Sequence, residues 1–485
     1  MGVIPKIEVL DKEDIEKIHE ASLRILNEVG VGIYCDDALK ILDEAGASVD
    51  YTHKIVRIPE DLVMEAVKKA PSIIKVFARN PKHNLVLGEG KVYFTNGFGA
   101  TKVLEEGKIR PATLEDLRKF TLICDALEHV HWIIPHIIPQ DIPKEVCDRY
   151  MALTMLENTS KHTTLLPFSP EGLQDIIKMA TIVAGGEEEF RKKSTLIGYG
   201  PQPTSPLQYS YESATYLMIL SKHKALIDIC VGPIAGATAP ATLAGTLAQG
   251  NAEFLAGLVL CQVTNPGTPV LYGSMATTMD LRHGTFTCGP ELALMNICFK
   301  QLASYYNLPF YGTGGVTDST TLDAQSIYEG VFSDILEALA GVDVIHDGVY
   351  GILEVGMIAN YEHLVIFHEI VSMIMYMLKG IEVNEETLAF DLIKKVGPGR
   401  SFLEVMDALK FLRQRMHKEY WLPDLTVRLS RKDWEAKGAK DIAQRAKEKV
   451  EQILREHEPE PLDRDVKREL EKIVSESTKK YAKHQ

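Results

Sequence analysis

Hydrophobic positions change their spacing along this chain near residue 114. In the first part, Ile15, Ile18 and Ile25 follow helical spacing, and short extended pieces occur around residues 73–78 and 91–95. Beyond Leu114, helical sequence alternates with short apolar runs. We therefore predict an N-terminal cap of helices and short strands over residues 1–100, followed by a strand–helix repeat.

Seven short apolar runs recur along this repeat, with starts 31 to 44 residues apart. They span residues 131–138, 162–168, 194–200, 225–233, 269–275, 309–315 and 342–348. Regular strand–helix units of this length specify a parallel sheet. The pattern allows an eighth strand near residue 350, so we expect an α/β fold, a TIM (β/α)8 barrel over residues 101–380. An open doubly wound sheet is the alternative.

The last part of the chain, residues 381–485, reads as a charged C-terminal helical extension. Ile442, Ala446, Val450 and Leu454 lie on one helical stripe, which indicates either a surface helix or a contact between subunits. We expect a homo-oligomer.

The overall charge argues against binding to a phosphate backbone. The formal net charge of the 485 residues is −14, and Lys and Arg form no block outside the mixed-charge tail. The opening residues lack the apolar core of a signal peptide, and charged residues and prolines interrupt the longest apolar stretch, residues 225–263. The seven cysteines are scattered and odd in number. We expect a cytoplasmic protein that binds neither nucleic acid nor a membrane.

Several predicted strands end with an aromatic residue just before glycine. These residues are Tyr199, Tyr272 and Tyr311. The run His346-Asp347-Gly348 is a similar strand end with an imidazole, and Tyr350 follows closely behind it. The carboxyl ends of barrel strands share one mouth, where enzymes of this fold place their working groups. A ring of aromatic faces there would hold a quaternary ammonium group. The alternative is a set of ordinary strand-end tyrosines whose hydroxyls are hydrogen-bonded in the core.

Two loops raise other kinds of chemistry. Asp280 and Arg282, after the fifth strand, either pair to stiffen their loop or orient a substrate. The run Gly312-Thr313-Gly314-Gly315 follows the sixth strand on this count, before the position where barrels usually bind phosphate. It lacks the GK[ST] of a P-loop, so nucleotide binding has little support. Glycine there would let a ligand or a planar cofactor approach the backbone.

A metal site is a further alternative. The pair His129 and His131 has a spacing found in metal-dependent barrel hydrolases, but it lies at the start of a strand. Zinc needs three or four converging ligands, and later strand ends supply no matching set.

Five segments together resemble the trimethylamine methyltransferase family of corrinoid-dependent methyltransferases. They are "IHEASLRILNEVGVGIYCDDALKILDEAGASVD", "PTSPLQYS", "PVLYGSMATTMDLRHGTFTCGPELALMN", "LPFYGTGGVTDSTTLDAQSIYEG" and "YWLPDLTVRLSRKDWEAKGAKDIAQRA". The resemblance implies a TIM barrel that passes a methyl group from an amine to Co(I) of a corrinoid on a separate small protein. Trimethylamine enzymes carry pyrrolysine, whereas this chain reads Gly315-Val316-Thr317 in the similar loop. It therefore resembles the branch without pyrrolysine, which demethylates quaternary amines such as glycine betaine, proline betaine or carnitine.

The resemblance also implies roles for single residues. His346, with Gln202 as its partner, is expected to anchor the far end of the substrate, such as a carboxylate. Glycine betaine enzymes are thought to use histidines there, so Gln202 counts against glycine betaine itself. The expected aromatic cage consists of Tyr350, Tyr311, Tyr272, Tyr199 and Phe98. The loop residues expected to face the corrinoid are Gly312, Gly314, Gly315 and Val316, and no bound metal is expected.

Leaving-group chemistry agrees with a quaternary substrate. A neutral amine substrate would have to release its nitrogen as an anion, which is a poor leaving group. A quaternary ammonium instead leaves as a neutral tertiary amine, so the enzyme mainly needs to position one methyl group. Two other functions stay open at this point: a metal-dependent TIM-barrel hydrolase, and a protein that binds a methylated cation without catalysis.

Overall fold

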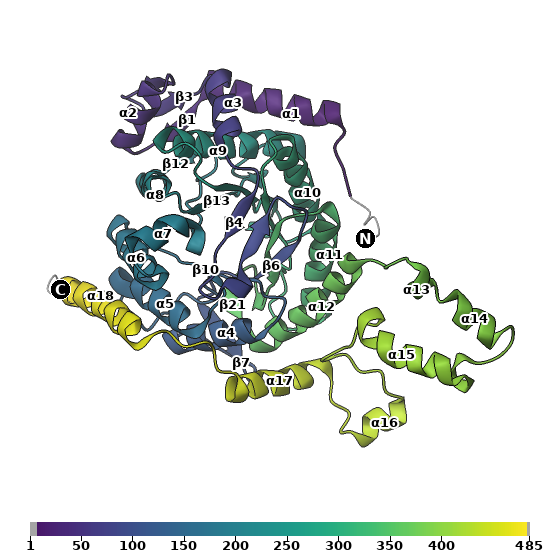
Figure 1. Ribbon diagram of the computed structural model, residues 1–485. Helices are drawn as coiled ribbons and strands as arrows, with labels where there is room; N and C mark the ends of the chain where they lie inside the picture. Colours follow the sequence, from purple (N-terminus) through teal and green to yellow (C-terminus); the bar gives the residue numbers. More distant parts are fainter. Residues whose placement is uncertain (1–6, 483–485) are drawn as a thin grey trace.

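Eight parallel strands close into a barrel in the computed structural model, which describes residues 7–482 (Figure 1). In chain order they are β6 (Tyr93–Asn96), β9 (Trp132–Ile133), β10 (His162–Thr164), β11 (Ile197–Tyr199), β13 (Leu226–Val231), β15 (Val270–Ser274), β18 (Phe310–Thr313) and β19 (Val344–Val349). The sheet closes because β6 pairs with both β9 and β19. This closure confirms the predicted TIM barrel and excludes the open doubly wound sheet.

The eighth strand comes first along the chain, not last. The sequence placed β6 within the cap, because its four residues are followed at once by a Gly-Phe-Gly turn and resemble an isolated extended piece. The predicted boundary at residue 100 therefore separates one strand from its barrel. The run 131–138 contains the second barrel strand, and the glycine-rich loop follows the seventh. The strand count thus no longer argues against phosphate at that loop.

Helices surround the barrel, as Figure 1 shows. They are α4 (Leu114–Ala126), α5 (Lys144–Asn158), α6 (Pro170–Ala184), α7 (Glu187–Lys192), α8 (Tyr211–Lys222), α9 (Leu243–Thr264), α10 (Pro290–Tyr305), α11 (Ala324–Ala340) and α12 (Tyr361–Lys379). Their ends follow local rules. Asp323 caps the start of α11 in a reciprocal capping box, and Gly341 ends the helix in the left-handed conformation.

The N-terminal part packs on the flank of the barrel. It contains α1 (Lys12–Arg24), a π-helical turn (Ile25–Val29), β1 (Val31–Ile33), α2 (Asp36–Glu44), β2 (Ser48–Asp50), β3 (Ile55–Arg57) and α3 (Glu60–Lys69). Its small sheet takes in β12 (Gln208–Tyr209) from the barrel region. Helices α1, α2 and α3 all contact α9, so the cap covers one side of the barrel (Figure 1).

A β-hairpin closes the other end of the barrel, where the strands start. Its strands are β4 (Ile74–Val76) and β5 (Leu85–Leu87). Their apolar side chains share one core with Trp132, Leu226, Leu271 and Val344 from the barrel interior. Access to the interior is therefore from the strand-end side.

The C-terminal extension returns to the barrel after a long excursion. Helix α17 (Ile442–Glu456) packs on α12 and α4, and α18 (Arg464–Ala482) packs on α5 and α6. Ala446 and Val450 of the predicted stripe are buried in these contacts, so the stripe serves the chain's own packing.

Residues 381–440, which we name the arm, extend away from the barrel (Figure 1). The arm contains α13 (Glu385–Leu388), α14 (Phe390–Val396), the 3₁₀ turn Phe402–Glu404, α15 (Met406–Glu419) and α16 (Arg431–Ala436).

Two whole-chain expectations can be compared with the structure. Within residues 7–482, every helix is too short or too polar to span a bilayer. All seven cysteines are buried and unpaired.

Candidate active site

Strand register determines which side chains point into the barrel. Successive residues of a strand face opposite sides of a sheet, and paired residues of neighbouring strands face the same side. Cys230, Gly273 and Tyr311 are paired across β13, β15 and β18. On β19, Val344 and His346 belong to the same inward set. The inward row thus brings together residues that lie far apart in the sequence.

A small cavity of about 40 Å³ lies above this row, at the ends of the strands. Its lining residues are Phe98, Ile134, Thr164, Leu166, Gly200, Gln202, Asp228, Cys230, Tyr311 and His346. Four residues singled out from the sequence therefore meet at one place: Phe98, Gln202, Tyr311 and His346.

His346 lies between two aromatic rings and two acids. Its ring centroid is 5.0 Å from that of Tyr311 and 6.2 Å from that of Phe98. Its Nδ1 atom is 2.8 Å from Oδ2 of Asp347, although the direction is not that of a hydrogen bond. The imidazole also interacts electrostatically with Asp228. The predicted anchor thus sits in acidic surroundings.

Asp347 has an unusual backbone for a buried strand residue. Its φ of 64° lies in the left-handed region, where the pairing of β19 with β6 shifts register. Bulges and left-handed non-glycine residues concentrate at functional sites, because the surrounding structure must impose the strain. Burial raises the pKa of the Asp347 carboxyl, and His346 opposes that shift.

Asp228 is a site residue that the sequence reasoning missed. It is buried on β13, and its carboxylate lines the cavity. Burial raises its pKa to about 7, against a smaller lowering by His346. A side chain at position 200 would collide with it, because a Cβ added to Gly200 would lie 2.0 Å from Oδ1 of Asp228. One signal was available: Asp228 is the single charged residue in an otherwise apolar strand.

The thiol and the phenol in the cavity stay protonated. Burial raises the pKa of Cys230 and of Tyr311 well above their ordinary values, and Asp228 adds to both shifts. Cys230 is therefore not poised as a nucleophile. Tyr311 offers a neutral ring and hydroxyl.

Tyr272 does not join the predicted cage. It is fully buried on the outer side of β15, where its ring stacks on Phe254 at 3.7 Å between centroids. Its hydroxyl donates a hydrogen bond of 2.8 Å to Oδ1 of Asn251. The alternative of an ordinary strand-end tyrosine describes this residue.

The other two cage candidates are not part of the described lining. Tyr350 is buried beyond the end of β19, near Gly356 and 6.3 Å from the ring of His363. The backbone of Tyr199 ends β11, but its side chain lies outside the described part of the structure. A cage role for Tyr199 stays a prediction.

Asp280, which is partly buried, and Arg282, which is exposed, form a pair away from the cavity. They lie at the tip of the hairpin of β16 (Thr277–Asp280) and β17 (Thr285–Phe286). Nε of Arg282 is 3.1 Å from Oδ1 of Asp280, and Nδ1 of His283 is 2.9 Å from Oδ2. The two side chains thus pair within their loop, and a role in orienting a substrate stays a prediction.

Buried acids occupy the space behind the glycine-rich loop. A Cβ on Gly312 would lie 2.5 Å from Glu337 of α11, and one on Gly314 would lie 2.4 Å from Asp334. Burial raises the pKa of both acids well above the ordinary range. On this side of the loop, these glycines therefore leave room for the chain's own carboxyl groups.

The rest of the loop is also enclosed. Gly315, with a φ of 67°, packs on the carbonyl oxygen of Asp347, and Val316 is 5% exposed. Glu329 accepts hydrogen bonds from the hydroxyl of Thr317 and the amide of Asp318. A loop with this carboxylate at its amides is a poor phosphate site.

The histidine pair considered for a metal lies at the opposite end of the barrel. The amide of Phe94 donates to Nδ1 of His131, and the amide of His129 donates to Nε2 of His368. Burial lowers the pKa of His131 to about 3. Within residues 7–482, we find no group of three or more His, Cys, Asp and Glu side chains placed to hold a metal ion.

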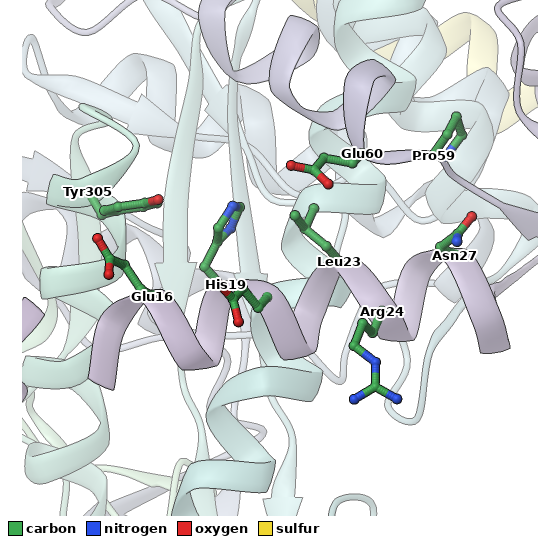
Figure 2. A pocket seen from close by; sticks show the side chains of 9 residues that line it. Glu16, His19, Leu23, Arg24, Asn27, Pro59, Glu60 and Tyr305 are labelled. Atoms are coloured by element: carbon green, nitrogen blue, oxygen red, sulfur yellow. The ribbon is translucent and has the colours of Figure 1, made fainter. Parts of the chain in front are cut away.

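A larger cavity of about 680 Å³ lies on the flank, between α1, the start of α3 and the end of α10 (Figure 2). In it, His19 points from α1 into the space between Tyr305 and Glu60. Nδ1 of His19 already pairs with the Tyr306 hydroxyl at 2.8 Å. Since barrel enzymes work at the strand-end face, the smaller cavity is the candidate active site.

The fold and this cavity define a class: a TIM-barrel enzyme whose mouth is lined by aromatic, amide and acidic groups. Comparison with known proteins then identifies the family. The family model described as trimethylamine methyltransferase (MTTB) matches residues 1–482. This chain belongs to the trimethylamine methyltransferase family, and it is a methyltransferase.

Two relatives come from Desulfitobacterium hafniense. A trimethylamine methyltransferase MttB of strain DSM 10664 / DCB-2 is 36% identical over 97% of this chain and 94% of its own length. A glycine betaine methyltransferase of strain Y51 is 34% identical over 98% of each chain. Family membership argues against both the hydrolase and the non-catalytic binding protein.

A solved structure shows the same fold. The monomethylamine methyltransferase MtmB of Methanosarcina barkeri superposes with a TM-score of 0.51, covering 92% of this chain and 88% of that one, at 15% identity.

Proposed function

We propose that this chain removes a methyl group from a small methylated ammonium and passes it to the Co(I) of a corrinoid carried by a separate protein. The observation that supports this most directly is the meeting of Tyr311, Phe98, His346 and Gln202 at one cavity in the barrel mouth. Aromatic faces attract methylated cations, and the relatives named above are amine and betaine methyltransferases.

The residues of the cavity suit such a transfer. When bound, the corrinoid supplies a reduced cobalt as the nucleophile, so the protein needs no nucleophile of its own. One C–N bond would break, the nitrogen would keep its electron pair and leave as a neutral tertiary amine, and the corrinoid would accept the methyl group. Tyr311 and Phe98 would hold the cationic nitrogen, and Gln202 would orient the rest of the molecule.

Enclosure of the cavity matters for this step. The hairpin of β4 and β5 blocks the far end of the barrel, so the ligand has one way in and one face presented outward. Buried aromatics exclude water from the cationic nitrogen, which strengthens its attraction to nearby dipoles and charges. Positive charge disperses as the methyl group leaves, so cation binding must stay moderate for the transfer to be fast.

The proposal also includes a corrinoid protein as partner and a loop of this chain that the corrinoid would approach. Gly312, Gly314, Gly315 and Val316 sit at the mouth, and we assign them to the rim that a corrinoid would approach. Their side of the barrel is the open one, although the residues are buried in this chain alone. We further assign the protein to the cytoplasm, where its seven unpaired cysteines would stay reduced.

We also propose a homo-oligomer, assembled through the arm. The arm exposes large apolar side chains, including Ile381, Phe390, Leu403 and Met406, around a core of only a few residues. Apolar surface of this kind marks an interaction site. The arm carries 12 Lys and Arg against 10 Asp and Glu, whereas the whole chain carries 53 against 67. A second acidic copy of the chain is therefore an electrostatically suitable partner.

Light scattering on the purified protein tests the assembly. We expect an oligomer that dissociates in the double variant Phe390→Glu, Leu403→Glu, while Tyr51→Glu, an exposed residue far from the arm, leaves it intact. A monomeric wild type would contradict this part of the proposal.

The activity is tested by following the absorbance change from Co(I) to methyl-Co(III). The protein is mixed with reduced free cobalamin and, one at a time, with tetramethylammonium, choline, glycine betaine, carnitine and trimethylamine. Methylation with at least one of the quaternary amines is expected. Failure with all of them, under conditions in which a known relative is active, would overturn the proposed function.

A further inference from the structure

The described residues that line the cavity include an acid but no permanently charged cation. Its described lining contains one carboxylate, Asp228, one imidazole, His346, and neither Lys nor Arg. A carboxylate ligand is usually held by a bidentate Arg or by a fully available cation. The side chains available here are the neutral groups of Gln202 and Thr164. The lining therefore lacks the partner that a betaine carboxylate needs.

His346 cannot easily supply that partner. Its Nδ1 atom is already 2.8 Å from the Asp347 carboxylate, and it interacts with Asp228 across the cavity. A carboxylate brought to this imidazole would be a third acid beside one ring. Like charges at short distance in a buried site repel strongly.

Asp228 itself needs a cation. Its side chain is 4% exposed, and no described residue gives its carboxylate a hydrogen bond in this structure. A buried carboxylate without a partner is costly, so such groups persist mainly where function uses them. The missing side chain at Gly200 leaves room for the carboxylate to lie against the cavity. Tyr311 and Phe98 line the same space, so the acid and the aromatic rings face one cavity.

We propose that Asp228 is the counter-ion of the substrate's ammonium group, and that the substrate is a methylated cation without a carboxylate, of the tetramethylammonium or choline class. This inference rests on the proposed function of the same cavity and adds the substrate class to it. Asp228 determines specificity: it favours a bare cation and disfavours a zwitterion, whose own carboxylate would lie close to it.

The neutral groups suit the far end of such a substrate. The hydroxyl of Thr164 accepts a hydrogen bond of 2.9 Å from Nε1 of Trp132, so its own hydrogen is free to be donated. The side-chain amide of Gln202 both donates and accepts. A hydroxyl, as in choline, can pair with either group without bringing a second negative charge into the cavity.

Calorimetric titration at pH 8 tests the charge preference without any corrinoid. Four probes are compared on the wild-type protein: tetramethylammonium, choline, glycine betaine, and 3,3-dimethylbutan-1-ol, the neutral carbon analogue of choline. We expect choline to bind at least about tenfold more tightly than either glycine betaine or the neutral analogue. Equal or tighter binding of glycine betaine would overturn the inference.

The variant Asp228→Asn removes the charge and keeps the shape. Choline affinity should fall at least about tenfold, the affinity for the neutral analogue should change little, and the preference for choline over glycine betaine should shrink. Glu212→Gln is the matched control, because it removes an exposed acid at the start of α8, outside the cavity. Thermal unfolding confirms that each variant is folded. Unchanged choline affinity in a folded Asp228→Asn protein would overturn the inference.

The spectroscopic assay separates this inference from the proposed function. Methyl transfer from glycine betaine with a higher kcat/KM than from choline would keep the methyltransferase and overturn the substrate class. The same holds if carnitine is the preferred substrate. Methyl transfer from choline or tetramethylammonium, lost in Asp228→Asn and kept in Glu212→Gln, would support both.

Discussion

Two tyrosines with the same sequence context have opposite places in this barrel. Tyr272 and Tyr311 each lie in a strand directly before a glycine, and their strands are neighbours. The register pairs Tyr272 with Phe310 and Gly273 with Tyr311. A shift of one residue moves a side chain to the other face of a sheet, so Tyr272 points out to α9 and Tyr311 points into the cavity. The dipeptide alone therefore cannot distinguish a tyrosine packed outside the barrel from one that lines the cavity.

The outward tyrosine should matter most for stability. Tyr272→Ala would leave a cavity beside Phe254 and remove the hydroxyl that pairs with Asn251. We expect the free energy of unfolding to fall by about 3–5 kcal/mol, measured by urea denaturation. Choline affinity of the folded protein should stay normal. A selective loss of choline binding would place Tyr272 in the site and contradict the comparison.

The inward tyrosine should matter most for the ligand. Tyr311→Leu removes the aromatic face and keeps an apolar side chain. We expect choline affinity to fall by about 30-fold, or about 2 kcal/mol, as for a cation–π contact away from water. Tyr311→Phe keeps the ring and should bind within about threefold of the wild type. Equal losses for choline and its neutral carbon analogue would show that Tyr311 provides packing only.

The same contrast explains how far the sequence predicted the fold. Seven of the eight strands were located, because buried parallel strands are continuous apolar runs at regular spacing. Strand β6 was assigned to the cap instead, since it is only four residues long and ends in polar Thr95 and Asn96. The strand–helix repeat was enough to predict a closed barrel. The identity of the eighth strand became clear only from the pairing of β6 with β19.

The site was predicted less completely, for a physical reason. Phe98, Gln202, Tyr311 and His346 do converge, but Tyr272 does not, because register is a property of paired strands. Asp228 was overlooked because a single acid in an apolar strand gives no indication of which side of the sheet its side chain faces. The glycines were correctly seen as places of close approach, yet what approaches Gly312 and Gly314 is the chain's own Glu337 and Asp334.

A change of pH should alter ligand binding at the inward face of the barrel wall, where Asp228 lies. Burial raises the pKa of Asp228 to about 7, so the carboxyl keeps its proton at pH 6 and loses it by pH 8. Only the ionised form attracts a cation. We therefore expect choline affinity to rise about tenfold between pH 6 and pH 8, measured by calorimetry in buffers of matched ionic strength.

The titratable groups that face Asp228 are His346 on β19, Tyr311 on β18 and Cys230 on its own strand, with Asp347 beside His346. The control is the same titration of Asp228→Asn, in which the rise should shrink. A rise of the same size in that variant would assign it to His346 or Asp347. Since the pKa of Asp228 is higher in the folded than in the unfolded chain, this carboxyl should also favour folding less as pH rises from 4 to 7.

We expect the smallest effect on choline affinity at the hairpin tip of Asp280 and Arg282. This tip belongs neither to the inward nor to the outward face of the barrel wall. The Arg282 side chain is 83% exposed, and its pairing with Asp280 bridges neighbouring positions of one tip. Exposed ion pairs contribute little, so Arg282→Ala and Asp280→Asn should each leave choline affinity within about twofold of the wild type. A tenfold loss would mean that the hairpin folds over the mouth when ligand is bound. Unchanged binding with slower methyl transfer to a corrinoid protein, but not to free cobalamin, would instead assign the hairpin to the contact with that partner.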